Sequence, residues 1–294
     1  MTTEVAIMNR RAVVLSADSA GTVTSWQEGK QETRYFKGEN KIFQLSLMYP
    51  IGIMIYSNSS LHGIPWEIII KHYRSEHKDH HPLLSDYCEH FLNWLNDNDY
   101  YFSSEFKQQI ILDKLKEAAL QIILPLIQQD NFKVIQEAEK KIQFIKTYLE
   151  GLLTKLEQIK LIGSLDIVDL QASIAEYENK AADFILKIFH AGMVADINIV
   201  GLAPIILRTC MNILYREHDF HDLTGIVIAG YGEKEFFPCL YEYKIFGFAG
   251  KKLAFSKKNE RKISLVFPRF TRQKLRSINE LGGSYERNKI YSGV

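Results

Sequence analysis

Residues 2–19 have the sequence TTEVAIMNRRAVVLSADS, which decides how the start of the chain folds. Two short apolar runs, Val5–Met8 and Ala12–Ser16, are separated by a polar segment. This spacing predicts two antiparallel strands joined by a turn. Thr2 precedes the first strand, and the second strand leads directly to Asp18. Ordinarily such a start is an edge hairpin with no chemistry of its own.

Thr2 gives this hairpin a potential chemistry. Methionine aminopeptidase removes Met1 when the second residue is small, so the mature chain is expected to begin with the amine and hydroxyl of Thr2. An α-amino group has an unperturbed pKa of about 7.7–8.0, and a modest downward shift lets it accept the hydroxyl proton near pH 7. Such a nucleophile needs a buried cation, and the cation needs a carboxylate. Lys41 and Asp18 are the candidates.

The same residues resemble the start of a proteasome β-subunit, an N-terminal-nucleophile hydrolase, in which TTxVAI is followed by a turn and VVLAADS. With Thr2 counted as the first residue, Asp18 is the seventeenth, as in the family, and the later KIF of residues 41–43 matches the lysine strand. The resemblance implies that Thr2 is nucleophile and base, that Lys41 lowers the pKa of the Thr2 hydroxyl, and that Asp18 anchors Lys41. It also implies an αββα sandwich and assembly into a homo-oligomer.

The resemblance extends to further positions, and one of its assignments has an alternative. The family glycine whose backbone N–H lines the oxyanion hole aligns with Ser57, and residues 225–243, GIVIAGYGEKEFFPCLYEY, resemble a later family hairpin. The loop between Asp18 and Lys41 is longer than in the family, so Lys37 is an alternative to Lys41. The family's later serine and aspartate, which support the threonine, have no close match.

The periodicity of the chain predicts an α+β fold in three blocks. The first block is rich in short β-branched and aromatic runs. From Pro65 the pattern becomes helical, and residues 105–189 carry apolar residues at three- and four-residue steps, interrupted at Pro125 and Gly163. A last helix and a second hairpin follow. The predicted strands are Val5–Met8, Ala12–Ser16, Thr22–Trp26, Thr33–Lys37, Ile42–Leu47, Ile51–Tyr56, Gly225–Ala229 and Phe236–Ile245, and the last helix is Leu202–Arg216.

These blocks predict a sandwich interrupted by a helical insertion. Residues 1–74 are expected to form its first half, residues 75–200 the insertion, and residues 201–294 the second half. Strand, helix and strand in this order favour a layered α+β domain.

The composition of the chain limits the classes of partner and cofactor that we expect it to bind. The 294 residues carry a formal charge of +1, so the overall charge favours neither nucleic acid nor an anionic membrane surface. The three cysteines are far apart and outside any CxxC spacing, which argues against disulfides and a zinc site. We expect no cofactor and no metal, no membrane-spanning segment, and a cytoplasmic location.

Several of these features also have a purely structural explanation. Asp18 alone typically caps a turn, and Lys41 alone is typical of a solvated edge strand. The histidine-rich residues 72–81 favour a solvated, pH-sensitive loop over a metal site, because they match no metal-binding pattern. The basic run Lys251–Lys262 favours a solvated hairpin tip over a nucleic-acid surface.

Two functions remain open at this point. The first is a threonine-type peptidase or amidohydrolase that acts on a peptide or another amide through Thr2. The second is an inactive relative, in which the sandwich is a scaffold and the helical insertion binds other proteins. The matches at Asp18 and residues 41–43 favour the enzyme.

Overall fold

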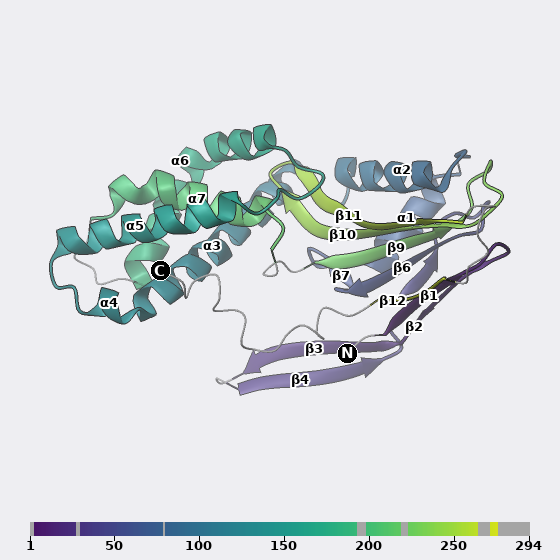
Figure 1. Ribbon diagram of the computed structural model, residues 1–294, viewed down its shortest axis with the longest axis horizontal. Helices are drawn as coiled ribbons and strands as arrows, with labels where there is room; N and C mark the ends of the chain where they lie inside the picture. The colour runs from purple at the N-terminus through teal and green to yellow at the C-terminus, as the bar shows by residue number, and fades with distance from the viewer. Residues whose placement is uncertain are drawn as a thin grey trace. The chain divides into compact units, whose positions relative to one another are not determined.

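The computed structural model describes residues 3–27, 30–78, 80–192, 198–218, 223–263 and 271–275 (Figure 1). The chain has a mixed α+β fold in which the described strand pairs are antiparallel. The predicted α+β class is therefore confirmed.

The strands follow the short apolar runs of the sequence, and most helices follow the three- and four-residue periodicity. The strands are β1 (Glu4–Met8), β2 (Val13–Ala17), β3 (Ala20–Gln27), β4 (Lys30–Lys37), β5 (Ile42–Gln44), β6 (Ile51–Ser57), β7 (Ser60–Leu61), β8 (Ile64–Pro65), β9 (Thr224–Gly230), β10 (Cys239–Ala249), β11 (Lys252–Lys262) and β12 (Thr271–Leu275). The helices are α1 (Trp66–Glu76), α2 (Leu84–Asp97), α3 (Ser104–Gln128), α4 (Asp130–Lys133), α5 (Ala138–Glu157), α6 (Ile167–Gly192), the 3-10 helix η1 (Val200–Leu202) and α7 (Ala203–Tyr215).

The described residues fall into two compact units, each assembled from separate stretches of the chain. The described residues of the sheet unit lie within 3–101, 223–247 and 255–275. Those of the helical unit lie within 102–218 and 248–254. Strands β10 and β11 therefore contribute residues to both units.

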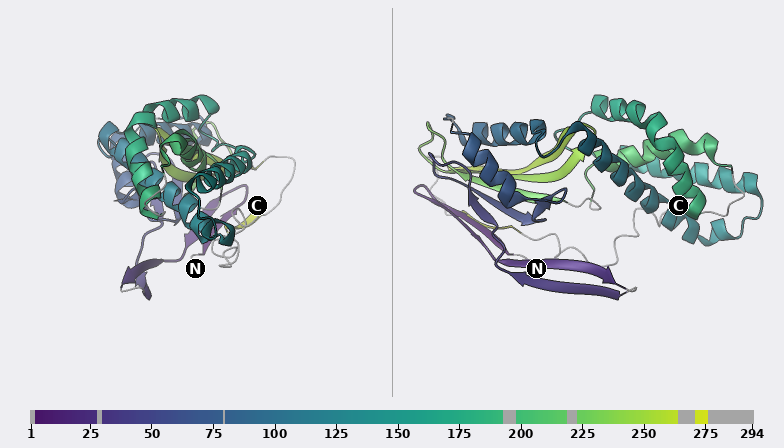
Figure 2. Two further views of the ribbon diagram at one scale, coloured as in Figure 1. Left: turned by 90° about the vertical axis from the view of Figure 1, so that its left-hand side faces the viewer. Right: turned by 180° about the vertical axis from the view of Figure 1, so that it is seen from behind.

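The sheet unit contains two sheets that face each other. One sheet has the order β12-β1-β2, and the other has the order β11-β10-β9-β6-β5. Between them lies an apolar core to which both sheets contribute: Ala6, Met8, Met54, Tyr56, Val227, Ala229 and Leu240. Helices α1 and α2 cover the other face of the five-stranded sheet, where α2 contacts β9 and α1 contacts β5 (Figures 1 and 2).

Strand β9 lies at the centre of the larger sheet. It pairs with β6 in the register Tyr56 to Gly225 and with β10 on its other edge. Every residue of β9 is buried, because one face meets the opposite sheet and the other meets the helices. Its sequence, TGIVIAG, is accordingly apolar throughout rather than alternating.

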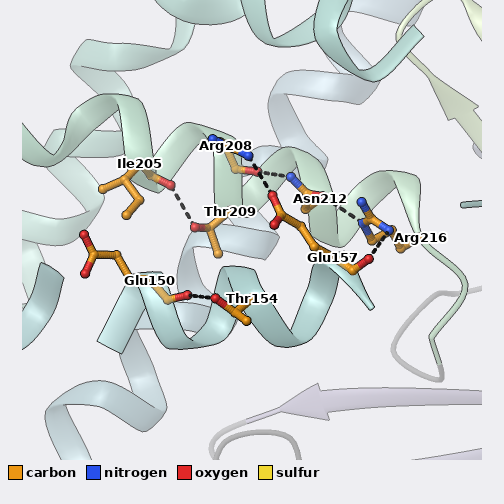
Figure 3. Close-up of polar contacts among 8 residues, drawn as sticks. All are labelled: Glu150, Thr154, Glu157, Ile205, Arg208, Thr209, Asn212 and Arg216. Carbon is orange, nitrogen blue, oxygen red and sulfur yellow. Dashed lines mark hydrogen bonds and ion pairs between the residues drawn. The ribbon is translucent and has the colours of Figure 1, made fainter. Parts of the chain in front are cut away.

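The helical unit packs α7 against α3, α5 and α6. Polar contacts link the end of α5 to α7 (Figure 3). Arg208 Nη2 lies 2.7 Å from Glu157 Oε1, and Arg216 donates through Nη1 to the Glu157 carbonyl at 3.1 Å. Arg216 also donates through Nε to Asn212 Oδ1 at 2.8 Å. The guanidinium thus satisfies a carbonyl that the last turn of α5 leaves without a helical partner.

The same unit contains the tip of the β10–β11 hairpin. Lys114 Nζ donates to the Phe248 carbonyl at 3.3 Å, and Ser164 Oγ donates to the Leu253 carbonyl at 2.9 Å. The ring of Phe248 packs against that of Phe102 with 4.8 Å between centroids. Within the described residues, no helix combines the length and apolar character needed to cross a membrane.

Two local expectations from the sequence are wrong. Helix α3 continues through Pro125 to Gln128, because a proline so close to the end of a helix removes one of its last hydrogen bonds and leaves the rest intact. Most of the basic run Lys251–Lys262 is strand β11 rather than a hairpin tip, because its residues pair with β10, although its lysines are exposed to solvent as expected.

The units also divide the chain differently from the predicted boundaries. Helix α2 lies inside the predicted insertion but belongs to the sheet unit, since it contacts β9. Helix α7 lies inside the predicted second half but belongs to the helical unit, since it contacts α5 and α6.

Candidate active site

The β1–β2 hairpin brings Asp18 back beside Thr3. The Asn9 side chain closes the turn by accepting hydrogen bonds from the N–H groups of Arg11 at 2.8 Å and Ala12 at 3.0 Å. The register pairs Glu4 with Ala17, and the Asp18 N–H donates to the Thr3 carbonyl at 3.1 Å. In return, the Thr3 N–H donates to Asp18 Oδ2 at 3.0 Å. The aspartate therefore fixes the backbone of the residue that follows Thr2.

Lys41 reaches the same aspartate from the position just before strand β5. Its Nζ donates to Asp18 Oδ1 at 2.7 Å and to the Ala20 carbonyl at 3.0 Å. Lys41 lies just before β5, where the Ile55 N–H donates to its carbonyl at 2.8 Å. The ammonium is thus held by a carboxylate and a carbonyl, with its backbone anchored to the five-stranded sheet.

A β-hairpin explains why Asp18 and Lys41 meet across 23 positions of sequence. Strands β3 and β4 run out and back in the register Ala20 to Lys37. The N–H groups of Gly38 and Glu39 then donate to the Ser19 carbonyl at 3.0 and 3.2 Å. The long connection therefore returns the chain to its starting point, so its length leaves the pairing of Lys41 with Asp18 intact.

The charge of Lys41 acts on Asp18. Burial raises the pKa of the Asp18 carboxyl, but hydrogen bonds from Lys41 and the Thr3 N–H, together with the lysine charge, outweigh it and hold the pKa below its ordinary value. Asp18 is consequently ionised at neutral pH, and the pair is a salt bridge.

Ser57 occupies the position that the resemblance gives to the oxyanion glycine. It ends β6 with a φ of +72°, a left-handed conformation that favours glycine and is uncommon for other residues. It lies two residues beyond Ile55, the residue hydrogen-bonded to Lys41, which corresponds to about 7 Å along the strand. Asp18 and Lys41 are in direct contact, whereas Ser57 lies farther along the sheet.

Two of the proposed positions lie beyond what the structure describes. Thr2 is outside the described residues, so its place is known only through its peptide bond to Thr3. The alternative lysine, Lys37, ends β4, and its side chain is likewise outside them.

Glu4 is a residue of this region that sequence analysis missed. Its side chain is fully buried, and Oε1 lies 3.9 Å from Lys41 Nζ. Glu4, Ala6 and Met8 alternate along β1 and are all buried, so the glutamate lies on the core-facing side of the strand. That alternation was the signal in the sequence that could have found it.

A second buried carboxylate lies in the same interior. The Tyr56 hydroxyl donates to Glu242 Oε1 at 2.7 Å, and Lys258 Nζ lies 3.0 Å from the same oxygen. Burial raises the pKa of Tyr56, and the charges of Glu242 and Glu4 raise it further, so the phenol stays protonated and is the donor.

The histidine-rich stretch is less solvated than its sequence predicts. The imidazole of His90, on α2, packs against those of His77 and His81 with centroids 4.7 and 4.9 Å apart, and its Nδ1 lies 2.8 Å from the Tyr73 hydroxyl. These contacts connect α2 with the end of α1 and with the segment between the two helices. Across the described ranges, no group of three or more His, Cys, Asp or Glu residues is arranged to hold a metal ion.

We compared the chain with protein-family models, with curated proteins and with solved structures, and none of the three comparisons finds a match.

Proposed function

We propose that this chain is an N-terminal-nucleophile hydrolase, similar to proteasome β-subunits, that cleaves peptide or other amide bonds with Thr2. The observation that supports this most is the arrangement at Asp18. One carboxylate oxygen binds the Lys41 ammonium, and the other fixes the N–H of Thr3, the residue bonded to Thr2. A cation and a fixed backbone next to a threonine are what an activated hydroxyl requires.

The layers of the sheet unit also support the proposal. Two antiparallel sheets face each other, and α1 and α2 cover the outer face of one of them. These are three successive layers of the αββα sandwich that the proposal assumes. In this arrangement the start of β1 and the residue before β5 meet, at Glu4 and Lys41. The proposal therefore attaches the nucleophile to a strand rather than to a loop.

In the proposed reaction, the free amine of Thr2 accepts the proton of its own hydroxyl as Oγ attacks the substrate carbonyl carbon. The tetrahedral intermediate collapses to an ester on Oγ, and the ammonium gives its proton to the departing amine. Water then attacks the ester with the amine again as base, which releases the acid and restores the hydroxyl. Lys41 stabilises the developing negative charge on Oγ, and the backbone at Ser57 supplies a donor to the oxyanion.

The decisive experiment is intact-mass analysis after treatment with a peptide epoxyketone. The hydroxyl of an N-terminal threonine adds to the ketone, and its amine opens the epoxide, so the protein gains the whole mass of the reagent. We expect a chain without Met1 and with a single adduct. The adduct is expected to disappear in Thr2→Ala, which still permits Met1 removal, and to persist in the matched control Thr3→Ser.

An inactive scaffold is the second candidate, with the helical unit as its binding surface. Helix α3 exposes Leu120 and Leu124 one turn apart, which favours a protein contact there. Retention of Met1, or a chain lacking Met1 that forms no adduct, would reject the hydrolase and leave the scaffold.

A further inference from the structure

Glu4 is a charged group placed where a strand normally carries an apolar one. It shares the core-facing side of β1 with Ala6 and Met8 and has no exposed surface. An ionised carboxylate loses its hydration in such a place, so it is retained at a cost unless a cation or donors compensate. Its position therefore calls for a physical explanation.

Lys41 is a cation at ion-pair distance from this carboxylate. The Lys41 side chain is 6% exposed and its Nζ lies 3.9 Å from Glu4 Oε1, whereas Asp18, which accepts its hydrogen bond, is 33% exposed. Lys41 is therefore held from the surface side by a hydrogen-bonded carboxylate and from the interior by a fully buried one. Water screens the interior charge least, so at equal distance it acts more strongly on the lysine.

The other buried carboxylate of this interior has a separate cation. Glu242 accepts the Tyr56 hydroxyl at 2.7 Å and pairs with Lys258 at 3.0 Å. Glu242 thus has the same burial as Glu4 and a neighbouring position but a different lysine, which makes it a natural control.

We propose that Glu4 is a positioning residue for the hydrolase, one that holds the Lys41 ammonium from the interior so that it stays in place beside Thr2 throughout the reaction. This inference rests on the proposed function. Asp18 has only one oxygen available for Lys41, because its other oxygen accepts a hydrogen bond from the Thr3 N–H. Glu4 opposes any displacement of Lys41 toward solvent.

The test compares Glu4→Gln with Glu242→Gln in the full chain, by following the rate of adduct formation with the peptide epoxyketone from pH 5 to pH 9. Glu4→Gln removes a charge two residues from the reacting amine, which disfavours the protonated amine and moves the rate profile to lower pH, by roughly half a unit or more. Its maximal rate falls on the order of tenfold, because Lys41 loses one of the two carboxylates that position its ammonium. Glu242→Gln leaves both quantities at the wild-type values.

A double-mutant cycle of Glu4→Gln and Lys41→Met, measured by urea unfolding, tests the contact without any activity. We expect the double variant to be more stable than the sum of the single effects predicts, by roughly fivefold or more in the unfolding constant. Additive effects, or a wild-type rate and pH profile in Glu4→Gln, would overturn the role of Glu4 while leaving the hydrolase in place. Failure of the wild-type protein to form the adduct would instead reject the hydrolase, and a coupled cycle would then make Glu4 a structural counter-ion only.

Discussion

At the scale of single residues, the most heavily engaged charge of the candidate site is the ammonium of Lys41. Lys41 Nζ meets Asp18, the Ala20 carbonyl and Glu4 at 2.7, 3.0 and 3.9 Å. Exposed lysine pairs contribute little to stability, but removing one partner of a buried pair leaves an uncompensated charge. The stability of the sheet unit should therefore depend on Lys41 whether or not the protein is an enzyme.

Lys41→Met is expected to lower the free energy of unfolding by about 3–5 kcal/mol at pH 7, because it removes the ammonium that lies 3.9 Å from the buried Glu4 carboxylate. Urea denaturation checks this value. Lys71→Met, which removes an exposed lysine paired with Glu67 on α1, is the matched control and should change stability by less than about 0.5 kcal/mol. Equal losses in the two variants would contradict the buried pair.

The same lysine sets a pH dependence. Since Lys41 and the Thr3 N–H hold the pKa of Asp18 below its ordinary value of 3.8, the unfolded chain binds its proton first as the solution is acidified. The stabilisation from Asp18 is thus fully present above about pH 4 and is lost as pH falls through the lowered pKa. In Asp18→Asn this loss should vanish, so its stability should fall less steeply than that of wild type between pH 4 and pH 2.

Gly225 shows how tightly the interior is packed at one residue. A Cβ added there would lie 1.8 Å from Cζ of Tyr56, its partner across β6 and β9. Gly225→Ala is therefore expected to displace the Tyr56 ring from Glu242 and to destabilise the protein by about 3 kcal/mol. Gly201→Ala, where a Cβ meets nothing within 4 Å, is the control for thermal or chemical unfolding. A Gly225→Ala variant as stable as the control would show that the ring can move freely.

At the scale of elements, local pattern predicted most of the strands and helices. The β1–β2 and β9–β10 hairpins and the helices after Pro65 follow from periodicity and turn residues that are contiguous in sequence. The pairing of Lys41 with Asp18 was also predictable, though through a resemblance rather than through periodicity. The alternation of Glu4 with Ala6 and Met8 is local and indicates a shared face, but the burial of that face depends on a sheet that lies elsewhere in the chain.

Helix α5 offers a test of intrinsic helix propensity. Gly151 lies inside this helix, and a Cβ there meets nothing within 4 Å. Gly151→Ala is expected to stabilise the protein by about 0.5–1 kcal/mol, since alanine loses less backbone freedom on folding. A rise in the urea midpoint with an unchanged slope would confirm this, and a fall would indicate an unseen packing constraint.

At the scale of the whole molecule, each unit is discontinuous in sequence. The helical unit includes residues 248–254, which sequence analysis assigned to the sheet domain, and the sheet unit includes α2. Such assignments depend on contacts between distant segments, as between Phe248 and Phe102, and a local pattern holds no information about them.

Phe248→Ala therefore tests the membership of the hairpin tip in the helical unit. The ring is fully buried against Phe102, and Lys107 Nζ lies 4.9 Å from its centroid. Its removal is expected to cost about 3–5 kcal/mol, observed in the helical circular dichroism signal during unfolding. Phe236→Ala, which removes a side chain that is 91% exposed, should leave that signal unchanged. Equal effects would show that the tip does not stabilise the helices.

Strands β6 and β9 pair in the sheet but lie far apart in the sequence, and this separation sets the order in which parts of the protein fold during synthesis. Strand β6 ends at Ser57, but its central partner β9 begins only at Thr224. At ribosomal rates of about 5–20 residues per second, the apolar β6 waits on the order of ten seconds for that partner to be made. Meanwhile helices α3, α5 and α6 emerge and begin to pack. The nascent chain therefore completes most of its helical unit before its larger sheet exists, and a chaperone bound to β6 would act in that interval.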